Sequence, residues 1–450
     1  MVFSSLEFIY VFLPVALGGY FLCPRGLKNL WLFAVSLFFY AFGEPVYLFL
    51  MLLSITVGYF AGRAIELRRR WGGAILCLCT VFFVGMLFFF KYYDPLAGLL
   101  SLPTHGLSLP IGISFYTFQV MSYIIDVYRG DAAAERSFVS FGAYLSLFPQ
   151  LIAGPIVKYT DVSAELSERR HSLRGTADGI ARFCVGLSKK VLLANGAGAL
   201  AKTVTAESSL LSLCLWLLLF ALQIYYDFSG YSDMAIGLGR ILGFSFPENF
   251  NYPYISESIT EFWRRWHMTL SSWFKEYVYI PLGGNRRGGW RTLLNLLAVW
   301  TLTGLWHGAW WNFLLWGLYF FVILIIEKYL LCRILSRLPR LLRHAYAIVL
   351  ILLGWLIFAA DGLSPTALAG ALTSAPADGR TAYLLLRNIP YIAIMLIGVT
   401  PLPKRLFERL SQRSETIFLT ARNVLSVLSL LISTAYIAAS GYDPFLYFRF

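Results

Sequence analysis

The stretch Thr301-Leu-Thr-Gly-Leu-Trp-His-Gly-Ala-Trp-Trp-Asn-Phe-Leu-Leu-Trp316 places one histidine, His307, among four tryptophans. It lies inside an apolar run that covers residues 292–326. At ~1.5 Å per residue, one helix over that run would be ~50 Å long, whereas the hydrocarbon core of a bilayer is only ~30 Å thick. We therefore expect the run to break, and the glycines that flank the histidine, Gly304 and Gly308, offer the least costly place.

A histidine at such a break is expected to face protein or a water-filled cavity. A charged side chain facing lipid at that depth costs roughly 2.5 kcal/mol or more, so His307 needs either a partner or a task. One interpretation is a neutral imidazole that is hydrogen-bonded to a neighbouring helix. The other is a general acid or base, because an ordinary histidine pKa near about 6.5 suits proton transfer at neutral pH.

The composition indicates an all-α polytopic membrane protein. Of the 450 residues, 58% are hydrophobic and 14% are charged, and the mean hydropathy is +0.67. A soluble domain has about 25% charged residues. The net charge of +13 is ordinarily caused by cationic cytoplasmic loops in such a protein, so we expect membrane lipids and no nucleic acid as partners.

The cysteines indicate neither a disulfide framework nor a zinc site. They form no CxxC pair and lie mostly in or beside apolar runs, at positions 23, 77, 79, 184, 214 and 332. Cysteines in such places behave as small hydrophobic residues. We expect no metal and no permanently bound cofactor.

Along the chain, apolar runs predict spans at residues 30–42, 46–60 and 73–90, after a first span that is not a cleavable signal. The run 138–156 contains two prolines and a glycine, so a re-entrant hairpin is expected there instead of a straight span. Residues 179–201 carry two adjacent lysines, Lys189 and Lys190, and are expected to form a helix that lies partly at the cytoplasmic interface.

Two carboxylates, Asp227 and Asp233, follow a predicted span over residues 210–226. They are candidates to bind a sugar hydroxyl or a cation. The alternative is an ion pair with a neighbouring arginine such as Arg240, and buried acids that pair with basic residues are the commoner case.

Ser258-Ile-Thr-Glu261 forms a capping box that predicts the start of a helix. Helical spacing then gathers Trp263, Trp266, Leu270, Trp273, Phe274 and Tyr277 on one apolar face, with Arg264, Arg265 and Lys275 on the opposite face. His267 falls at the edge of the aromatic stripe on this predicted helix. Whether it meets His307 in a single cavity is left open by the sequence.

Three segments resemble the signature of the membrane-bound O-acyltransferase (MBOAT) family, in the bacterial branch typified by the alginate O-acetylation membrane protein. They are Phe262-Trp-Arg-Arg-Trp-His-Met-Thr-Leu-Ser-Ser-Trp273, Tyr279-Ile-Pro-Leu-Gly-Gly-Asn-Arg-Arg-Gly288 and Gly304-Leu-Trp-His-Gly-Ala309. Supporting blocks lie at residues 109–119, 148–155, 226–235 and 444–450. The likeness runs nearly end to end and weakens at 333–380 and 402–423.

The resemblance implies a single integral-membrane domain over 1–450, with N-terminal helices in 1–130, a catalytic core in 138–326 and C-terminal helices in 327–450. It implies roughly 10–12 transmembrane helices with re-entrant and interfacial helices. These would form a ring that is thinned at its centre, with a cytoplasmic funnel for an acyl donor and an extracytoplasmic opening for an acceptor.

The resemblance also implies roles for individual residues. His307 matches the catalytic histidine of the family and His267 its second histidine, which has either a chemical or a structural role. The donor would be a thioester, acetyl-coenzyme A or an acyl carrier, attracted by Arg264, Arg265, Lys275, Arg286 and Arg287. His307 would deprotonate an acceptor hydroxyl, while His267, Trp306 or a backbone N–H at the Gly304/Gly308 break would stabilise the oxyanion.

For this branch we expect an acetyl group and an acceptor hydroxyl on a cell-surface polysaccharide or on an extracytoplasmic acyl-relay protein. The expected location is a bacterial cell membrane. Two alternatives remain. A membrane transporter also has broken helices at the midplane, although the sequence shows no second copy of the Trp-His-Gly break. An acyltransferase for a lipid or a protein terminus would share the histidine but need a lipid-facing acceptor entrance.

Overall fold

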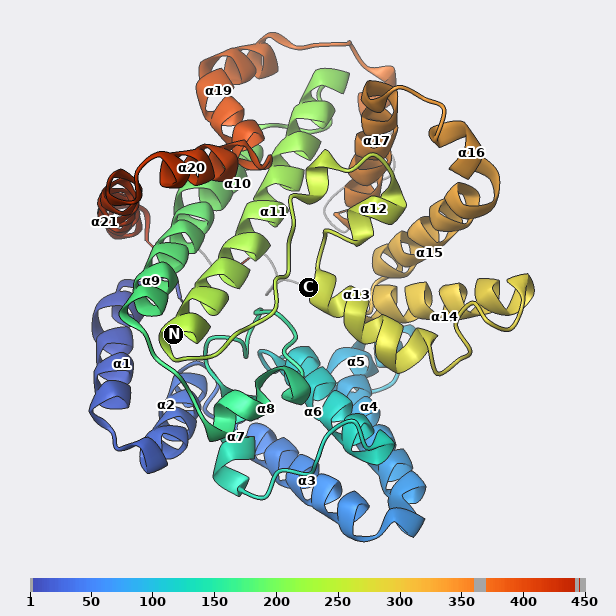
Figure 1. The fold of residues 1–450 in the computed structure, drawn as a ribbon. Coiled ribbons are helices and arrows are strands. Elements are labelled where there is room, and N and C mark those ends of the chain that lie inside the picture. The colour runs from blue at the N-terminus through green and yellow to red at the C-terminus, as the bar shows by residue number, and fades with distance from the viewer. Residues whose placement is uncertain (1–2, 360–369, 442–444, 446–450) are drawn as a thin grey trace. The chain divides into compact units, whose positions relative to one another are not determined.

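The computed structural model describes residues 3–359, 370–441 and 445, and within these it is helical with no β-strand (Figure 1). Eight helical segments in the described residues are long and apolar enough to cross a membrane. The expected all-α polytopic membrane protein is thus confirmed. Roughly 10–12 were expected. The eight do not include shorter helices such as α6 (Ile113–Arg129), which has 17 residues, and α7 (Phe138–Ser146), which has nine.

The chain divides into two compact units, which are described separately. The first contains Met1–Leu187, Tyr231–Glu248 and Thr434–Pro444. Its helices are α1 (Leu13–Leu22, preceded by the π-helix Phe8–Phe12), α2 (Lys28–Gly43), α3 (Leu48–Leu67), α4 (Gly72–Lys91), α5 (Tyr93–Leu99), α6, α7, α8 (Tyr159–Ser167) and α9 (Leu173–Ser188). The predicted spans at 30–42, 46–60 and 73–90 correspond to α2, α3 and α4.

The second unit contains Ser188–Gly230, Asn249–Ser433 and Phe445–Phe450. Most of α11 (Leu210–Ile241) belongs to it, and the end of that helix belongs to the first unit. Its other helices are α10 (Asn195–Thr203), α12 (Ile259–Trp263), α13 (Met268–Phe274), α14 (Gly289–His307), α15 (Trp311–Ile326), α16 (Cys332–Leu335), α17 (Arg340–Phe358), α19 (Gly379–Gly398) and α20 (Leu402–Arg413). Most of α21 (Glu415–Ser440) also belongs to this unit.

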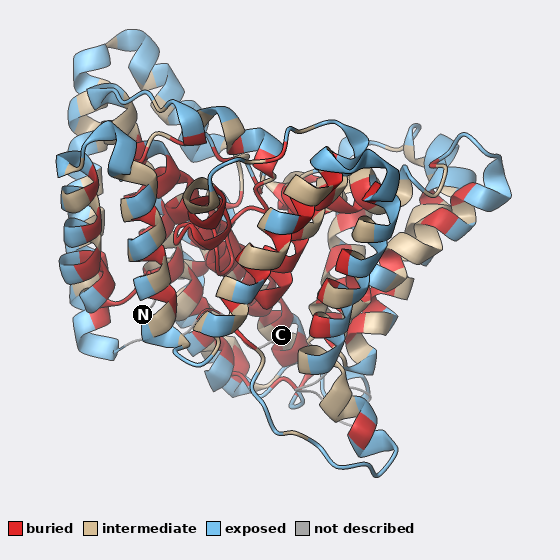
Figure 2. Cartoon of the chain, turned by 90° about the horizontal axis from the view of Figure 1, so that it is seen from below, coloured by how far each residue is buried: buried red, intermediate tan, exposed pale blue. Residues whose placement is uncertain are grey.

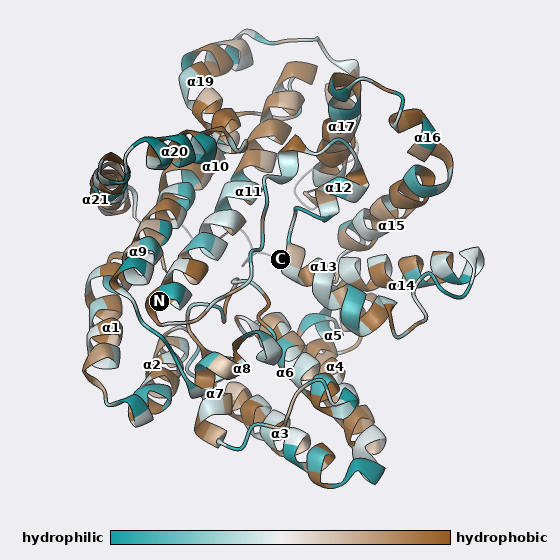
Figure 3. Cartoon of the chain, viewed as in Figure 1, coloured by the Kyte–Doolittle hydropathy of each residue, from teal (hydrophilic) through white to brown (hydrophobic). Residues whose placement is uncertain are grey.

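The outer faces of several helices are apolar and exposed, as expected for surfaces in contact with lipid (Figures 2 and 3). In α4 the apolar window has a mean hydropathy of 2.5 but only 17% of it is buried, and in α21 only 11% is buried. Exposure of such apolar faces to water is unfavourable in free energy, whereas contact with lipid tails is not. The chain is therefore a multi-pass integral membrane protein.

The run 138–156 is not a straight span, as its prolines predicted. Helix α7 ends at Ser146, and the buried segment that follows is not an α-helix. Side chains satisfy part of its buried backbone: Phe148 N–H donates to Ser36 Oγ at 3.1 Å, and Tyr144 OH donates to the Val157 carbonyl at 3.0 Å. These bonds make a non-helical course possible inside the protein. Whether it re-enters the membrane stays a prediction.

The predicted interfacial helix over residues 179–201 is instead part of a longer helical path. Helix α9 continues through the π-helical segment Lys189–Ala194 into α10. Lys190 is buried within this path, and its buried partner is Asp227 of α11, at 2.7 Å. Whether part of the helix lies at the cytoplasmic interface stays a prediction.

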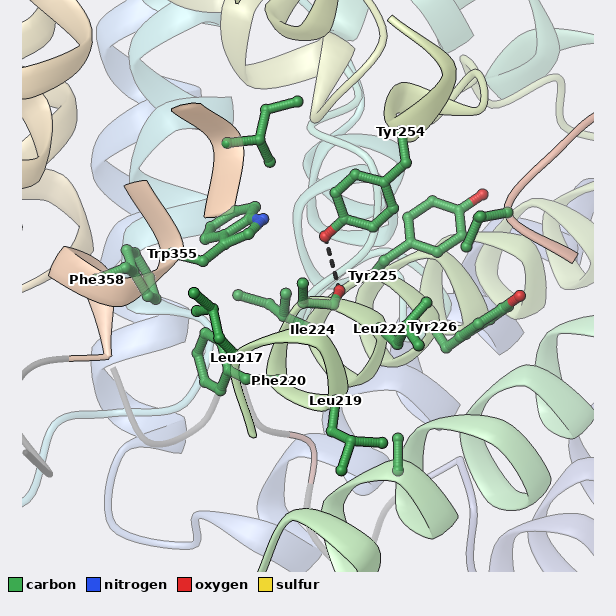
Figure 4. Close-up of a cluster of buried hydrophobic side chains, with 14 of the residues drawn as sticks. Leu217, Leu219, Phe220, Leu222, Ile224, Tyr225, Tyr226, Tyr254, Trp355 and Phe358 are labelled. Atoms are coloured by element: carbon green, nitrogen blue, oxygen red, sulfur yellow. Dashed lines mark hydrogen bonds between the residues drawn. The ribbon is translucent and has the colours of Figure 1, made fainter. Parts of the chain in front are cut away.

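The core of the second unit is built on α11 and α17 (Figure 4). Apolar side chains of α11 lie near Tyr254 and near the α17 residues Trp355 and Phe358. Tyr254 OH donates to the carbonyl of Ala221 at 2.7 Å, which gives its buried hydroxyl a partner. This core supports the elements that carry the two histidines, because α12 packs against α15 and α17.

Candidate functional site

The predicted break lies directly after His307. Helix α14 ends at His307, Gly308 is extended with φ −176°, and α15 begins at Trp311 (Figure 1). The backbone N–H of Gly308 donates to the carbonyl of Gly304 at 3.4 Å. His307 is therefore the last residue of a long helix, at the point where the chain leaves the helical conformation.

Gly304 does not break the helix, in contrast to the expectation from sequence. It lies within α14, where α14 and α15 pack as an antiparallel hairpin. A Cβ atom on Gly304 would lie 2.5 Å from the carbonyl oxygen of Phe313, and one on Gly317 would be closer still to the carbonyl oxygen of Trp300. The two glycines thus allow the two backbones to approach, and this approach fixes where His307 lies.

Aromatic rings surround His307. The ring centroids of Trp306 and Trp316 each lie 4.9 Å from its own, and that of Phe358 lies at 5.4 Å, all with interplanar angles of 77–82°. The residue as a whole is nevertheless partly exposed, whereas its Nδ1 atom is buried. Access from both sides of the membrane stays a prediction.

His267 lies at a break in the predicted helix over residues 258–277. Helix α12 ends at Trp263, α13 begins at Met268, and His267 between them has φ +42° and ψ +54°. The expectation of one continuous helix was therefore wrong. Two backbone hydrogen bonds pin the turn to a neighbouring loop: Met268 N–H to the carbonyl of Asn249, and Asn251 N–H to the carbonyl of Arg265, both at 2.9 Å.

The imidazole of His267 is fully enclosed and held by Asn249. It is 1% exposed, and its Nδ1 atom lies 3.0 Å from Asn249 Oδ1. The same oxygen accepts from the hydroxyl of Thr269 at 2.9 Å. Burial lowers the pKa of His267 to about 3, so the ring is neutral at physiological pH. The sequence analysis missed Asn249, because no spacing rule relates it to His267.

Trp306 connects the two histidines. Its ring centroid lies 6.0 Å from that of His267 and 4.9 Å from that of His307. The indole is buried. Both imidazoles therefore border the same tryptophan and belong to one cluster of rings. Whether they share a single cavity stays a prediction.

The aromatic face predicted for residues 258–277 is confirmed in spite of the break. Trp263 packs edge-on against Trp300 at 4.8 Å and Phe320 at 4.9 Å, and Trp266 lies 4.8 Å from Trp355. The predicted N-cap also forms, since Glu261 N–H donates to Ser258 Oγ at 3.0 Å.

The carboxylate of Glu327, which was not predicted from the sequence, stabilises the start of α12. Glu327 is buried, and its two oxygens accept from the backbone N–H groups of Ile259 at 2.6 Å and Thr260 at 2.8 Å. A carboxylate on the first N–H groups of a helix is favourable by both hydrogen bonding and the helix dipole. It anchors the segment that carries His267.

The basic residues that were predicted to attract the donor fall into two groups. Arg265 is tied to the protein by an ion pair with Glu261 at 2.9 Å and a hydrogen bond to the carbonyl of Asn251 at 3.0 Å. The others are exposed, and none forms an ion pair within the part of the chain that the structure describes; they are Arg264, Lys275, Arg286 and Arg287. Only this second group is available to an anionic ligand.

Asp227 and Asp233 each form an ion pair. Lys190 Nζ lies 2.7 Å from Asp227 in a pair whose side chains are 2% and 3% exposed. Asp233 accepts from Arg182 at 2.9 Å, and Arg182 also contacts Glu248. The suggestion that Arg240 is a partner was wrong, since Arg240 lies 3.9 Å from Asp178. Both carboxylates therefore have structural partners, and their role in substrate binding stays a prediction without support from this geometry.

The fold and the histidine cluster define a class: a multi-pass helical membrane protein with two histidines that border one buried tryptophan. The family model of the membrane-bound O-acyltransferases matches residues 131–360. A probable alginate O-acetylase of Pseudomonas putida is 37% identical over the full length of both chains. One of Azotobacter vinelandii is 43% identical over 81% of this chain and 76% of its own. A peptidoglycan O-acetyltransferase of Helicobacter pylori is 35% identical over 81% of this chain and 78% of its own.

The chain belongs to the membrane-bound O-acyltransferase family. It is an O-acyltransferase of the branch that resembles the alginate O-acetylases. The match of the family model includes α12, α13, α14 and α15, and so both histidines.

Proposed function

We propose that this enzyme transfers an acetyl group from a cytoplasmic thioester donor, across the membrane, to a hydroxyl group of a cell-surface polysaccharide or of a relay protein. The observation that carries the proposal is the position of His307, a partly exposed residue at a helix end among aromatic rings, which shares the neighbour Trp306 with a second histidine. The names of the relatives support it, because each specifies acetyl transfer to a saccharide polymer.

In the proposed reaction, His307 accepts the proton of the acceptor hydroxyl as its oxygen attacks the thioester carbonyl. The C–O bond forms, the C–S bond breaks, and the proton passes from the imidazolium to the departing thiolate. General-base help of this kind contributes typically ~10²–10⁴-fold. In this proposal the neighbouring rings of Trp316 and Phe358 limit the access of water to His307, which protects the thioester from hydrolysis.

Trp306 is our choice for the group that stabilises the oxyanion. Of the donors considered from sequence, the backbone N–H of Gly308 already donates to the carbonyl of Gly304. The indole N–H can only donate, and the ring of Trp306 lies beside both histidines. A donor placed in a site from which water is excluded stabilises developing negative charge more than it would in water.

The exposed basic residues Arg264, Lys275, Arg286 and Arg287 are proposed to attract the donor. Coenzyme A carries phosphate groups, and an acyl carrier protein presents its phosphopantetheine on an acidic surface. Cations that have no acidic partner among the described residues are suited to both. The proposal places these residues on the cytoplasmic side of a bacterial cell membrane.

The alternatives differ in how much support they keep. Membership of an acyltransferase family argues against the transporter. An acyltransferase that acts on a lipid or a protein terminus would share the histidine. The relatives argue against it, because their names specify alginate and peptidoglycan.

The test is an assay with purified protein in liposomes, labelled acetyl-coenzyme A inside and candidate acceptors outside. We expect label to appear on a polysaccharide or on an extracytoplasmic relay protein from the same cell. His307→Ala should give no product, and label found only on lipid would support the alternative acceptor. Transport of intact acetyl-coenzyme A without transfer would overturn the proposal.

A further inference from the structure

We propose that Asn249 is a positioning residue that holds His267 in the tautomer with hydrogen on Nδ1, so that Nε2 accepts a hydrogen bond from an amide N–H of the donor's pantetheine arm. The assignment of the tautomer stands on the contacts of His267 alone. The assignment of the ligand rests on the proposed function.

The tautomer follows from the orientation of the Asn249 side chain. The backbone N–H of Thr269, which can only donate, lies 3.4 Å from the atom assigned as Oδ1, and the Thr269 hydroxyl lies 2.9 Å from it. If the amide were reversed, its NH₂ group would face another N–H. The atom that faces His267 Nδ1 at 3.0 Å is therefore an oxygen, and Nδ1 must carry the hydrogen.

A neutral imidazole with hydrogen on Nδ1 has a lone pair on Nε2. Burial keeps this ring neutral, since it lowers the pKa of His267 to about 3. The Nε2 atom is buried and has no hydrogen-bond partner within residues 3–359, 370–441 and 445. A buried acceptor without a partner is costly, which indicates that a ligand supplies the missing donor. The same lone pair excludes His267 as a donor to the oxyanion.

The backbone conformation of His267 supports the proposal that its ring is held in a defined position. A residue other than glycine rarely adopts a positive φ, and such conformations persist where the surroundings enforce them. Here Asn249 acts twice: its carbonyl accepts from Met268 N–H, and its side chain accepts from His267. Asn249 is itself buried, with no exposed surface.

The ligand is inferred from the chemistry of the same segment. Arg264 and Lys275, both exposed cations, lie on either side of His267 in the sequence, at the end of α12 and after α13. If they bind the donor's phosphates, the arm that runs from the phosphates to the thioester is the part that reaches His267. A pantetheine arm carries amide N–H groups whether it belongs to coenzyme A or to an acyl carrier protein.

The first test is nuclear magnetic resonance of the full-length protein in liposomes, with ¹⁵N-labelled histidine. His267→Gln identifies the signal of His267. We expect hydrogen on Nδ1 and none on Nε2 across neutral pH. Hydrogen on Nε2 would overturn the tautomer and the positioning role of Asn249. This measurement needs no activity, so it stays informative if acetyl transfer itself is not observed.

The second test compares two small acetyl donors. One is the acetyl thioester of N-acetylcysteamine, which has one amide N–H; the other has an ester oxygen in place of that N–H and the same length. Loss of one buried hydrogen bond corresponds to about tenfold, so we expect kcat/KM to be about tenfold higher for the amide donor. Equal values in the wild type would overturn the proposed ligand.

Asn249→Leu removes the acceptor for Nδ1–H, and Asn249→Asp retains an acceptor oxygen. We expect the preference for the amide donor to fall to near unity in Asn249→Leu and to remain in Asn249→Asp. If Asn249 had a purely structural role, its replacement would lower kcat/KM equally for both donors, and the ratio of the two kcat/KM values would not change. If Asn249→Leu does not fold, the spectroscopic result and the donor pair in the wild type still decide the proposal.

Discussion

The two histidine-bearing regions of this enzyme position their imidazoles by opposite means. His307 ends a long helix, is partly exposed, and is fixed by a glycine-lined helical hairpin. His267 sits in a left-handed turn between two short helices, is fully enclosed, and is fixed by hydrogen bonds to Asn249. The first arrangement leaves a partly exposed residue at a helix end, and the second leaves a ring with one fixed hydrogen-bonding face. This difference suits one group that moves a proton and another that orients a ligand.

The largest expected effect is that of replacing His307, which tests whether this histidine is the one that moves the proton. We expect His307→Ala to lower kcat/KM by about 10²–10⁴-fold, because a general base contributes about that much. The thermal unfolding temperature should hardly change, because the side chain is only partly buried. Activity is measured by acetyl transfer, and folding by thermal denaturation in detergent. Turnover at the wild-type rate in a folded His307→Ala protein would remove His307 from the reaction.

The glycine-lined hairpin can be tested with a matched pair of glycines. Gly304→Ala places a Cβ atom against the carbonyl of Phe313, and overpacking of this kind costs roughly 1–3 kcal/mol of stability. Gly85 in α4 is also helical but has no atom within 4 Å of an added Cβ. Gly85→Ala should therefore be neutral or stabilising by up to about 1 kcal/mol.

Thermal unfolding of both variants, with acetyl transfer measured below the transition, checks this prediction. A Gly304→Ala protein as stable as Gly85→Ala would show that the close approach of α14 and α15 is not required.

The two regions also differ in how far the sequence predicts them. An apolar run too long for the bilayer requires a break, and that length argument placed His307 at a helix end. The role of Gly304 was not predictable, because it depends on a partner helix whose register the sequence does not show. The ring-shaped arrangement of the helices stays a prediction.

For His267 the sequence predicted which neighbouring side chains are buried, but it did not predict the turn of the backbone at this residue. The apolar positions from Trp263 to Tyr277 fit one helical stripe, and they are largely buried, yet the chain turns at His267. Periodicity is insensitive to such a turn when the side chains on both sides pack into the same core. The partners Asn249 and Glu327 were missed for a related reason: they come from other segments and are fixed only by tertiary structure.

The strained turn gives a third prediction. Asparagine tolerates a left-handed conformation better than most residues, whereas a β-branched residue does not. His267→Asn should therefore fold like the wild type and lose the preference for the amide-containing donor, while His267→Val should be less stable than His267→Asn by about 1–2 kcal/mol. Unfolding temperatures of the two variants test the backbone. Equal stability would mean that the positive φ at His267 is not maintained.

The smallest expected effect concerns the cations beside His267, which the sequence could not tell apart. Arg264 is exposed without an acidic partner in the described residues, whereas Arg265 pairs with Glu261. Arg264→Glu should raise KM for acetyl-coenzyme A by about three- to tenfold with little change in kcat, because one unfavourable charge near a phosphate is worth about 1 kcal/mol at low salt.

The matched variant Arg265→Gln keeps the length and polarity of the side chain and should change KM less than twofold, since this arginine is already neutralised by Glu261. The salt dependence distinguishes a charge effect from a change in shape: raising the ionic strength should bring the KM of Arg264→Glu closer to that of the wild type, because exposed charges are screened within a Debye length of ~8–10 Å. A KM that is unchanged in Arg264→Glu, or one that rises equally in both variants at every salt concentration, would contradict the proposal that the donor binds at Arg264. The histidine pair would then have to receive its thioester by another route.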